Sequence, residues 1–445
     1  MATRKEKREQ EKNTNYFFEF IKIKKHFFKG FTGYLKKVKD HRHQSYVDYT
    51  PEVILFLVIL KNMAALKSMR LMSESFNKEE CIENICKILG LEELKELPHY
   101  DTVNDFLSGL EVSELEDIRT YMIKELLKKR CFEDYRIEGK YWGIIFDGTG
   151  LYTFDKKHCK HCLKREYKNQ ETGETKIIYM HHVLEAKLVV GDMVLSIGTE
   201  FIENENEEVP KQDCEIKAFY RLAEKIKQTY PRLPICILGD SLYACEPVFV
   251  LCDQYNWKYI FRFKEGRIKS VAEEFEAIKA GETKIVIKEK DGVTKQELLW
   301  VNDISYNNRE VNLIEAKIDT EDGSKSKQFL FLTGIKITKT NAERLVATGR
   351  SRWKIENQGF NNQKNIRYHL EHANSHDYTA MKNHYLLIQI TDIMVQLFEN
   401  GLKILRDLKK TAKEISSNLL EAIRTRRVTD EDITLLVKPI QIRFT

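Results

Sequence analysis

Residues 141–150 read YWGIIFDGTG, a short β-rich run that leads into a turn, with Asp147 where the run ends. Residues 234–240 read PICILGD, a second compact apolar run that also stops at an aspartate, Asp240. An acid that follows a strand is often an ordinary turn or cap residue, so neither aspartate is informative by itself. Together they predict two strands whose ends carry carboxylates.

The segment after the first aspartate has the pattern of a hairpin. Residues 183–190 and 193–201 are two apolar runs, and the Gly191-Asp192 pair between them suits a two-residue hairpin turn. The segments predicted next are a helix at residues 213–229, a helix at 246–255 and a strand at 259–263.

A third acid lies on a helix farther along the chain. Residues 340–343, TNAE, fit a capping box, which predicts a helix that runs through Glu356 to about Lys364. The resulting order is strand with the first aspartate, hairpin, helix, strand with the second aspartate, helix, strand, and helix with the glutamate. This is the order of a ribonuclease H-like core, an α/β fold in which helices flank a mixed sheet.

Three such acids need a cation. Carboxylates held close together repel one another unless a divalent cation lies between them. Two Mg²⁺ ions about 3.5 to 4 Å apart can clamp the attacking and leaving oxygens of a phosphoryl displacement. We therefore expect Asp147, Asp240 and Glu356 to be catalytic residues and ligands of two Mg²⁺ ions, which Mn²⁺ can replace.

The rest of the chain is arranged around this core. The predicted parts are a mobile charged tail (1–15), a helical DNA-binding domain (16–138), the first part of the core (139–263), a β-rich insertion (264–335), the completion of the core with Glu356 (336–400) and a basic helical tail (401–445). Helices are predicted at residues 50–68, 78–89, 91–97, 102–110 and 113–129, and a long amphipathic helix at 378–405. The alternative for the N-terminal helices is a purely structural cap.

The net charge of +5 hides an uneven distribution along the chain. Residues 1–45 hold 13 Lys and Arg against 5 Asp and Glu, and residues 401–445 hold 10 against 6. The centre must then carry about −7, which suggests a polyanion held by basic flanks around a carboxylate-dependent site. Residues 22–42 interleave Phe and Tyr with Lys, as a nucleic-acid surface does. The alternatives are Lys-rich helices that only confer solubility and an amphipathic helix that lies on the helical domain.

Composition excludes several classes of protein. With 445 residues, two or three domains are expected, since single cores stop growing near about 250 to 300 residues. Apolar residues make up 42% of the chain and only 7 residues are proline, which excludes a mostly disordered chain. The longest apolar run, Val53 to Leu60, is far shorter than the roughly 20 residues of a membrane span. Nine scattered cysteines, with no recognisable secretory signal, predict reduced thiols and a cytoplasmic location.

A family resemblance rests on the residues around the glutamate. Residues 352–356, RWKIE, followed by Lys364, resemble the end of the catalytic core in DDE transposases of bacterial insertion sequences. The similarity is to the insertion-sequence-four-like group, which is marked by a Tyr-Arg-Glu-Lys signature. Residues 146–149, FDGT, look like its first acid block, and residues 237–244, ILGDSLYA, look like its second. A β insertion before the glutamate is also typical of the group, and the resemblance covers about residues 140–400.

The chain departs from the signature at two positions. The signature places Tyr three residues before the Arg and Lys seven after the Glu, where this chain has Gly349 and Gln363. Lys364 is one residue late, which rotates it by about 100° on a regular helix, so it can serve only if the helix ends or bends nearby. Arg352 and Glu356 are four residues apart and share a helix face.

The resemblance implies a DNA transposase that cleaves phosphodiester bonds at transposon ends and transfers the strands into target DNA. Its partners would be double-stranded DNA, as inverted repeats and as target, and a second copy of the chain in the synaptic complex, with no membrane. Arg352 and Lys364 would contact DNA, Arg352 through a phosphate. Trp300, in the β insertion, would stack on a flipped base, unless it is an ordinary core residue of that insertion.

Two other functions stay open. A nuclease on the same fold would cut DNA without joining it, and a domesticated DNA-binding protein would do neither. The β insertion and the RWKIE block at residues 352–356 favour the transposase.

A second metal site is suggested shortly after the first acid. Cys159 and Cys162 have the spacing of metal ligands but form only half a site. His181 lies across the predicted hairpin and can complete it. One interpretation is a structural Zn²⁺ at these three residues, and the alternative is a loop of free thiols and solvated imidazoles.

Overall fold

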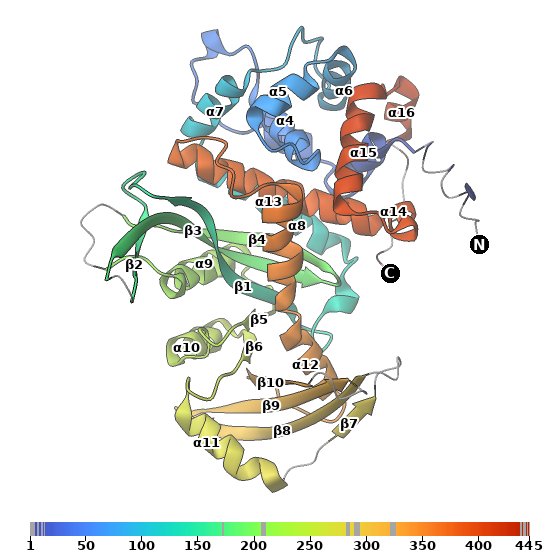
Figure 1. The fold of residues 1–445 in the computed structure, drawn as a ribbon. Helices are drawn as coiled ribbons and strands as arrows, with labels where there is room; N and C mark the ends of the chain where they lie inside the picture. The colour runs from blue at the N-terminus through green and yellow to red at the C-terminus, as the bar shows by residue number, and fades with distance from the viewer. Residues whose placement is uncertain are drawn as a thin grey trace.

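The computed structural model is elongated, with helices at one end, a sheet through the middle and a β-rich part at the other end (Figure 1). It describes residues 5, 6, 9, 12, 14–170, 173–205, 211–281, 285–288, 294–320, 326–436, 438, 442 and 444. Most of the predicted tail, residues 1–15, lies outside the described residues. The described chain is a mixed α/β fold in which helices flank a ten-stranded mixed sheet. In this part of the chain no helix is long and apolar enough to cross a membrane.

One sheet joins the described strands. They are β1 (Trp142–Phe154), β2 (Leu163–Lys168), β3 (Thr175–Val190), β4 (Met193–Ile202), β5 (Ile235–Gly239), β6 (Lys258–Arg262), β7 (Ile285–Lys288), β8 (Thr294–Tyr306), β9 (Arg309–Thr320) and β10 (Ser326–Thr333). Their order is β2-β3-β1-β5-β6-β10-β9-β8-β7, and β4 pairs with β3. β1 is antiparallel to β3 and parallel to β5, and β5 is parallel to β6. Because β10 pairs with β6 in antiparallel, the strands of the predicted insertion extend the same sheet.

The hairpin prediction is confirmed, whereas the turn predicted at the end of the first strand is wrong. Residues Val190 and Met193 pair across the Gly191-Asp192 turn. β1 does not stop at Asp147, because the long β3 pairs with it as far as Phe154. The glycine-rich sequence that predicted a turn instead contains a shift of register, a local irregularity that glycine tolerates.

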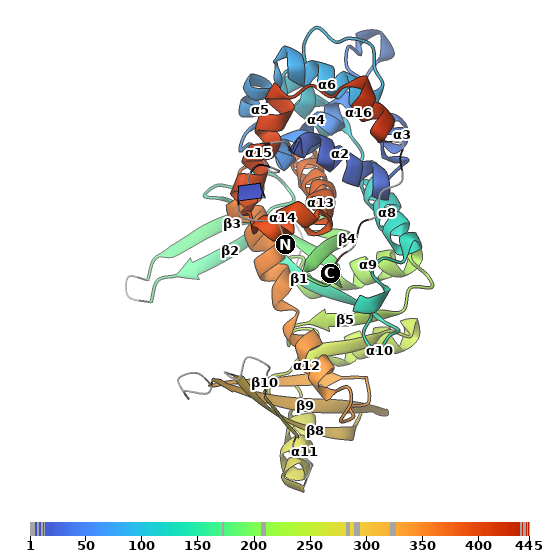
Figure 2. The same ribbon diagram turned by 90° about the vertical axis from the view of Figure 1, so that its right-hand side faces the viewer.

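The helices lie on both faces of the sheet and at one end of it. They are α2 (Tyr16–Phe27), α3 (Phe31–Lys36), α4 (Pro51–Met63), α5 (Met69–Phe76), α6 (Glu79–Leu89), α7 (Tyr100–Gly109), α8 (Val112–Lys129), α9 (Glu215–Thr229), α10 (Glu246–Tyr255), α11 (Lys269–Ile278), α12 (Ala342–Arg350), the π-helix η4 (Ile355–Arg367), α13 (Tyr378–Gly401), α14 (Lys403–Leu408), α15 (Ala412–Thr425) and α16 (Asp430–Leu435). Short 3₁₀ turns are η1 (Gln44–Tyr46), η2 (Glu133–Tyr135) and η3 (Lys279–Gly281). Figure 2 shows α9 and α10 on one side of the sheet and α12 and α13 on the other.

The long helix α13 is a central element rather than a surface one. It contacts α2, α4, α7 and α8 as well as strand β4. The long helix predicted at residues 378–405 is present as Tyr378–Gly401. Its side chains from Ala380 to Phe398 are buried with few exceptions, so it is not amphipathic as predicted. A helix that lies between a sheet and a layer of helices has no face left for water.

The helix predicted at residues 91–97 is absent. α6 ends at Gly90 in the left-handed conformation, with φ of 65°, which stops the helix. The backbone N–H of Leu97 donates instead to Asn77 Oδ1 at 2.9 Å. Leu91 and Leu94 pack against the core from this irregular segment, so tertiary contacts replace the local helix propensity of the leucines and glutamates.

The two ends of the chain form one helical layer. α15 packs on α2 and α6, as the red and blue helices of Figure 1 show. The Asn84 side-chain amide donates to the carbonyls of Ile423 and Arg426 at 3.1 and 2.9 Å. Both basic flanks therefore lie at the same end of the molecule.

The phenylalanines of the N-terminal basic segment belong to the core of this layer. Phe27, Phe28 and Phe31 are each 1% exposed, whereas Tyr34 is exposed and stacks on Tyr121 with ring centroids 3.9 Å apart. The segment at residues 22–42 therefore packs as an amphipathic segment on the helical domain. This was the alternative to the nucleic-acid surface.

The helix predicted from residues 340–343 through Glu356 is divided in two. α12 begins after Asn341, whose side chain makes no cap bond to the helix, and it ends at Arg350. The chain then resumes as the π-helix η4, which carries Glu356. Because π-helical bonds close wider turns than α-helical bonds, the 100° rotation inferred for Lys364 does not apply.

A buried polar network fastens η4 to α13 and the sheet. Lys187 of β3 is fully buried, and its Nζ donates to Gln389 Oε1 at 2.9 Å and lies 3.7 Å from Asp392 Oδ2. The same Asp392 oxygen accepts from Gln363 of η4 at 2.9 Å and from Gln396 at 2.8 Å. These bonds hold η4 in place against the face of the sheet where the acids lie.

Candidate active site

The register of two parallel strands brings Asp147 and Asp240 side by side. β1 and β5 pair with Ile145 opposite Leu238, and each aspartate lies two residues farther along the chain. Neighbouring strands are about 4.8 Å apart, and side chains two residues apart point to the same face of a strand. Both carboxylates therefore lie at the carboxyl end of this strand pair.

Arg352 links Asp147 to the third predicted acid, Glu356. Its Nη1 donates to Asp147 Oδ2 at 3.2 Å and to Glu356 Oε1 at 2.9 Å. Arg352 lies in the break between α12 and η4, and Glu356 lies in the first turn of η4. The side chains of Arg352 and Asp147 are only 14% and 20% exposed, so water screens the contact weakly.

A fourth acid, Glu215, joins the cluster and is not among the predicted site residues. It begins α9, and its Oε1 accepts a hydrogen bond from the Tyr243 hydroxyl at 2.7 Å. A Cβ atom on Gly148 would lie 2.8 Å from Glu215 Oε2, so glycine is what allows this close approach. In the sequence, Glu215 looks like any acid in the first turn of a helix, and Tyr243 like any core aromatic residue.

The cluster carries more negative than positive charge. Burial raises the pKa of the Asp147 carboxyl to about 7; Arg352 opposes the rise, and the three neighbouring acids add to it. Burial also raises the pKa of Glu215, and the hydrogen bond from Tyr243 opposes that rise. Four carboxylates around one guanidinium leave a site that attracts cations.

The donor set fits hard divalent cations. Carboxylate oxygens are the ligands that Mg²⁺ and Mn²⁺ prefer, and Asp147, Asp240 and Glu356 supply them from three different elements. Among the described residues, oxygens of these three acids do not all lie within 4.8 Å of one another, since the Arg352 guanidinium stands between Asp147 and Glu356.

The structure shows what surrounds Gly349 and Gln363, the two positions that depart from the Tyr-Arg-Glu-Lys signature. A Cβ atom on Gly349 would lie 2.7 Å from the Phe331 ring, so a tyrosine there would displace that ring. Gln363 is buried in the polar network of η4. Lys364 pairs with Glu371 at 3.0 Å, and within the described chain no hydrogen bond or ion pair joins it to the predicted acids.

Trp300 lies in the core of the β-rich part. It is 8% exposed and belongs to a hydrophobic cluster with Leu298 and Ile314. Trp300 therefore packs as an ordinary core residue of the β insertion, which was the alternative to stacking on a flipped base.

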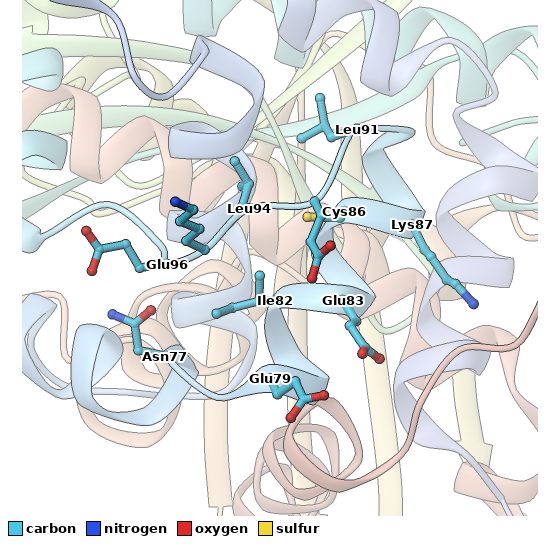
Figure 3. A pocket seen from close by; sticks show the side chains of 11 residues that line it. Asn77, Glu79, Ile82, Glu83, Cys86, Lys87, Leu91, Leu94 and Glu96 are labelled. Carbon is cyan, nitrogen blue, oxygen red and sulfur yellow. The ribbon is translucent and has the colours of Figure 1, made fainter.

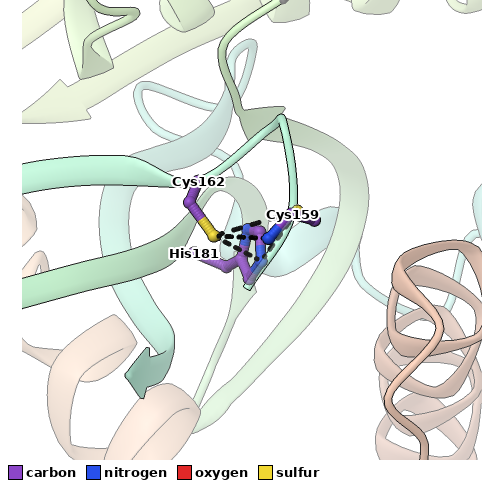
Figure 4. A group of neighbouring side chains, drawn as sticks. All are labelled: Cys159, Cys162 and His181. Atoms are coloured by element: carbon purple, nitrogen blue, oxygen red, sulfur yellow. Dashed lines mark hydrogen bonds between the residues drawn. The ribbon is translucent and has the colours of Figure 1, made fainter. Parts of the chain in front are cut away.

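The three predicted zinc ligands come together at a separate place. Cys159, Cys162 and His181 have donor atoms that all lie within 4.8 Å of one another (Figure 4). The sequence spacing of the cysteines predicted that the two thiols lie close together. The pairing of β2 with β3, with Leu163 opposite Met180, brings His181 to them.

A pocket of about 720 Å³ lies in the helical layer, around α6 (Figure 3). None of the predicted acids lines it, and its own carboxylates include Glu79, Glu83 and Glu96. Arg427 of the basic tail pairs with Glu79 and Glu83, both at 3.2 Å. Lys87 and Lys95 also line the pocket, which is therefore a mixed-charge surface separate from the acid cluster.

Replacing Tyr243 by Phe is expected to lower the free energy of unfolding by about 1.5 to 3 kcal/mol at pH 8, because buried Glu215 loses a hydrogen bond to its charged form. Urea unfolding measures the change. The loss should shrink at pH 4, where Glu215 is protonated. Tyr46→Phe, at a side chain that is 84% exposed, is the control and should change stability by less than about 0.5 kcal/mol. Equal midpoints for both variants would contradict the role of this hydrogen bond.

No protein-family model matches the chain, and no curated protein matches it.

Proposed function

We propose that this protein is a DDE-type DNA transposase, which uses divalent cations to cleave DNA at transposon ends and to join those ends to target DNA. The observation that carries the proposal is the register of β1 and β5, which sets Asp147 and Asp240 at the same level of two adjacent parallel strands. Glu356 joins them through Arg352. Carboxylates from separate elements that converge in this way suit metal-assisted phosphodiester chemistry.

The strand order supports a ribonuclease H-like core. β4, β3 and β1 are antiparallel neighbours, and β1, β5 and β6 are parallel neighbours. Strands β7 to β10 stand between the second aspartate and the glutamate in the chain, where the transposase group has a β insertion.

Each residue of the site has a proposed role. Asp147, Asp240 and Glu356 would hold two Mg²⁺ ions, and the ions would supply charge stabilisation and an activated oxygen nucleophile. Arg352 presents a planar fork of donors, which suits a phosphate oxygen as well as the carboxylates it contacts here. Glu215 would add a fourth carboxylate beside Asp147 and so favour cation binding.

Double-stranded DNA is the proposed partner, with a homodimer holding the two ends together and the cytoplasm as location. Lys364 and Trp300 would contact DNA only after rearrangement. Lys364 would have to leave Glu371, and Trp300 would have to leave its core cluster.

Strand transfer with purified protein tests the proposal. The assay contains Mg²⁺ and duplex DNA that carries the terminal inverted repeats of the element, and it compares wild type with Asp147→Ala, Asp240→Ala and Glu356→Ala. Each acid variant is expected to lose cleavage by at least roughly 1000-fold, because the site acts as a unit. Asp253→Ala, at a carboxylate that is 60% exposed and paired with Arg309, is the control and should keep wild-type activity.

The outcomes separate the three functions. Folded acid variants that cut and join like wild type would show that the assigned site is wrong. Cutting without joining by the wild type would favour the nuclease. DNA binding without any cutting, with divalent cation present, would favour the non-catalytic DNA-binding protein.

A further inference from the structure

The loop between β1 and β2 holds two thiols against one imidazole (Figure 4). Cys159 Sγ and Cys162 Sγ are 3.8 Å apart. The His181 Nε2 atom, on β3, lies 3.6 Å from Cys159 Sγ and 3.5 Å from Cys162 Sγ. The two sulfurs are much farther apart than the roughly 2.05 Å of a disulfide, so both cysteines are thiols in this structure.

These three distances are those of one face of a zinc tetrahedron. A tetrahedral Zn²⁺ with Zn–S bonds of about 2.3 Å and a Zn–N bond of about 2.05 Å requires an S···S separation of about 3.8 Å and S···N separations of about 3.5 Å. We propose that Cys159, Cys162 and His181 bind one Zn²⁺. Binding releases the two thiol protons to solvent and leaves a neutral imidazole as the third ligand.

The surroundings hold the ligands ready for a metal. The His181 ring is stacked on Tyr378 with centroids 4.3 Å apart and meets the edge of Phe154 at 5.8 Å, which fixes the direction of Nε2. The Asn204 side-chain amide donates to the Cys162 carbonyl at 3.0 Å. The Cys159 N–H donates to Cys162 Sγ at 3.4 Å. Ligands that are fixed in advance lose little entropy when a metal binds.

His158 is suited to be the fourth ligand. Its Nε2 lies 2.8 Å from the His376 carbonyl, and a metal-bound imidazole normally donates its other ring N–H to such a group. The His158 and His181 ring centroids are 6.4 Å apart. His158 is not part of the three-residue cluster in this structure, so its Nδ1 would have to move toward the cluster to bind the same ion.

The site would join three parts of the chain. Cys159 and Cys162 precede β2, His181 lies on β3, and Tyr378 begins α13 directly after the segment that follows η4. Zinc would therefore fasten the base of the β2–β3 hairpin near the segment that leads away from Glu356. The role is structural and independent of the proposed DNA chemistry.

The test measures zinc binding by the full-length protein, not catalysis. After dialysis against chelator, wild type is expected to bind one Zn²⁺ per chain in competition with a chromophoric chelator. Co²⁺ should produce thiolate charge-transfer bands and the visible bands of tetrahedral cobalt. Cys159→Ser, Cys162→Ser and His181→Gln should each weaken zinc binding by roughly 100-fold or more. Cys131→Ser, at a free thiol outside the cluster, is the matched control and should bind like wild type.

The melting temperature supplies a second measurement that does not need a variant. Zinc should raise the melting temperature of the wild-type apoprotein, since it binds the folded state. Wild-type protein that holds no zinc, or ligand variants that bind zinc as Cys131→Ser does, would overturn the site. His158→Ala should weaken binding by roughly 10-fold, and unchanged affinity would overturn its assignment as fourth ligand.

Discussion

Asp147→Asn is expected to abolish DNA cleavage and, at the same time, to stabilise the folded protein at pH 8. Cleavage should fall by roughly 1000-fold or more, because a neutral amide binds hard cations much more weakly than a carboxylate does. The free energy of unfolding, measured by urea titration in chelator, should rise by up to about 4 kcal/mol, which corresponds to a pKa shift from 3.8 to about 7. The two effects have one cause, because burial and, to a lesser extent, the neighbouring acids disfavour the ionised Asp147 carboxylate when no cation binds it.

The raised pKa of Asp147 explains why the substitution should stabilise the protein at pH 8. Burial raises the pKa of Asp147 from 3.8 to about 7, so the folded state disfavours the ionised carboxylate. The stability linked to this group is fully present below pH 3.8 and is lost as the pH rises through about 7. At pH 8 the wild-type protein therefore loses stability because its buried carboxylate is ionised, whereas the neutral asparagine causes no such loss. Near pH 4 the two proteins should be almost equally stable.

Added Mg²⁺ supplies the control for this prediction. It should stabilise wild type at pH 8, because cations bind only the folded site, and it should leave Asp147→Asn unchanged. Asp253→Asn, at an exposed carboxylate, should respond to Mg²⁺ like wild type. A variant that is less stable than wild type at pH 8 in chelator, or one that still cleaves DNA, would contradict the assigned site.

Asp392→Ala is expected to lower the free energy of unfolding by about 3 to 5 kcal/mol. It removes the acceptor that Gln363, Gln396 and Tyr368 share, and it leaves the fully buried Lys187 without its carboxylate. A buried charge that loses its partner keeps the whole desolvation penalty. Urea unfolding at pH 7 measures the loss, and Asp392→Asn should cost less because it keeps one acceptor oxygen.

The surface pair Arg70–Glu74 is the matched control. Its side chains are 78% and 56% exposed, so Glu74→Ala should cost less than about 1 kcal/mol. DNA cleavage should also fall in Asp392→Ala protein that is still folded, because Gln363 anchors the helix that carries Glu356. Similar stability losses in Asp392→Ala and Glu74→Ala would show that the network does not stabilise the fold.

The acids could be predicted because their positions depend on local pattern. A compact apolar run predicts a strand, and two parallel strands pair in a fixed register. The aspartates that lie two residues beyond the Ile145–Leu238 pair therefore come side by side, although β1 continues past Asp147. The hairpin at Gly191-Asp192 follows from turn chemistry in the same way. Arg352 and Glu356 are near in sequence, and four residues suffice to bring them into contact.

The features that could not be predicted depend on contacts with distant segments. Glu215 reaches the site because Gly148 leaves space for it, which requires knowing how α9 lies on the sheet. α13 is buried all round because two layers cover it, although its sequence also carries polar residues. They include Gln389, which accepts from Lys187, and Asp392, which accepts from Gln363. They also include Gln396, which pairs with the backbone of Val194. Periodicity alone assigns such residues to the surface.

The helices at the two ends of the chain pack together in one layer, so this layer can be completed only late in synthesis. Asn84 leaves the ribosome 339 residues before its partner Ile423. Until α13 emerges, the part of α4 that packs on it stays uncovered and prone to aggregation, since the side chains of α4 are all buried in the finished fold. A premature stop after Glu356 would therefore yield a polypeptide that carries all three acids but lacks the helices that cover its N-terminal half.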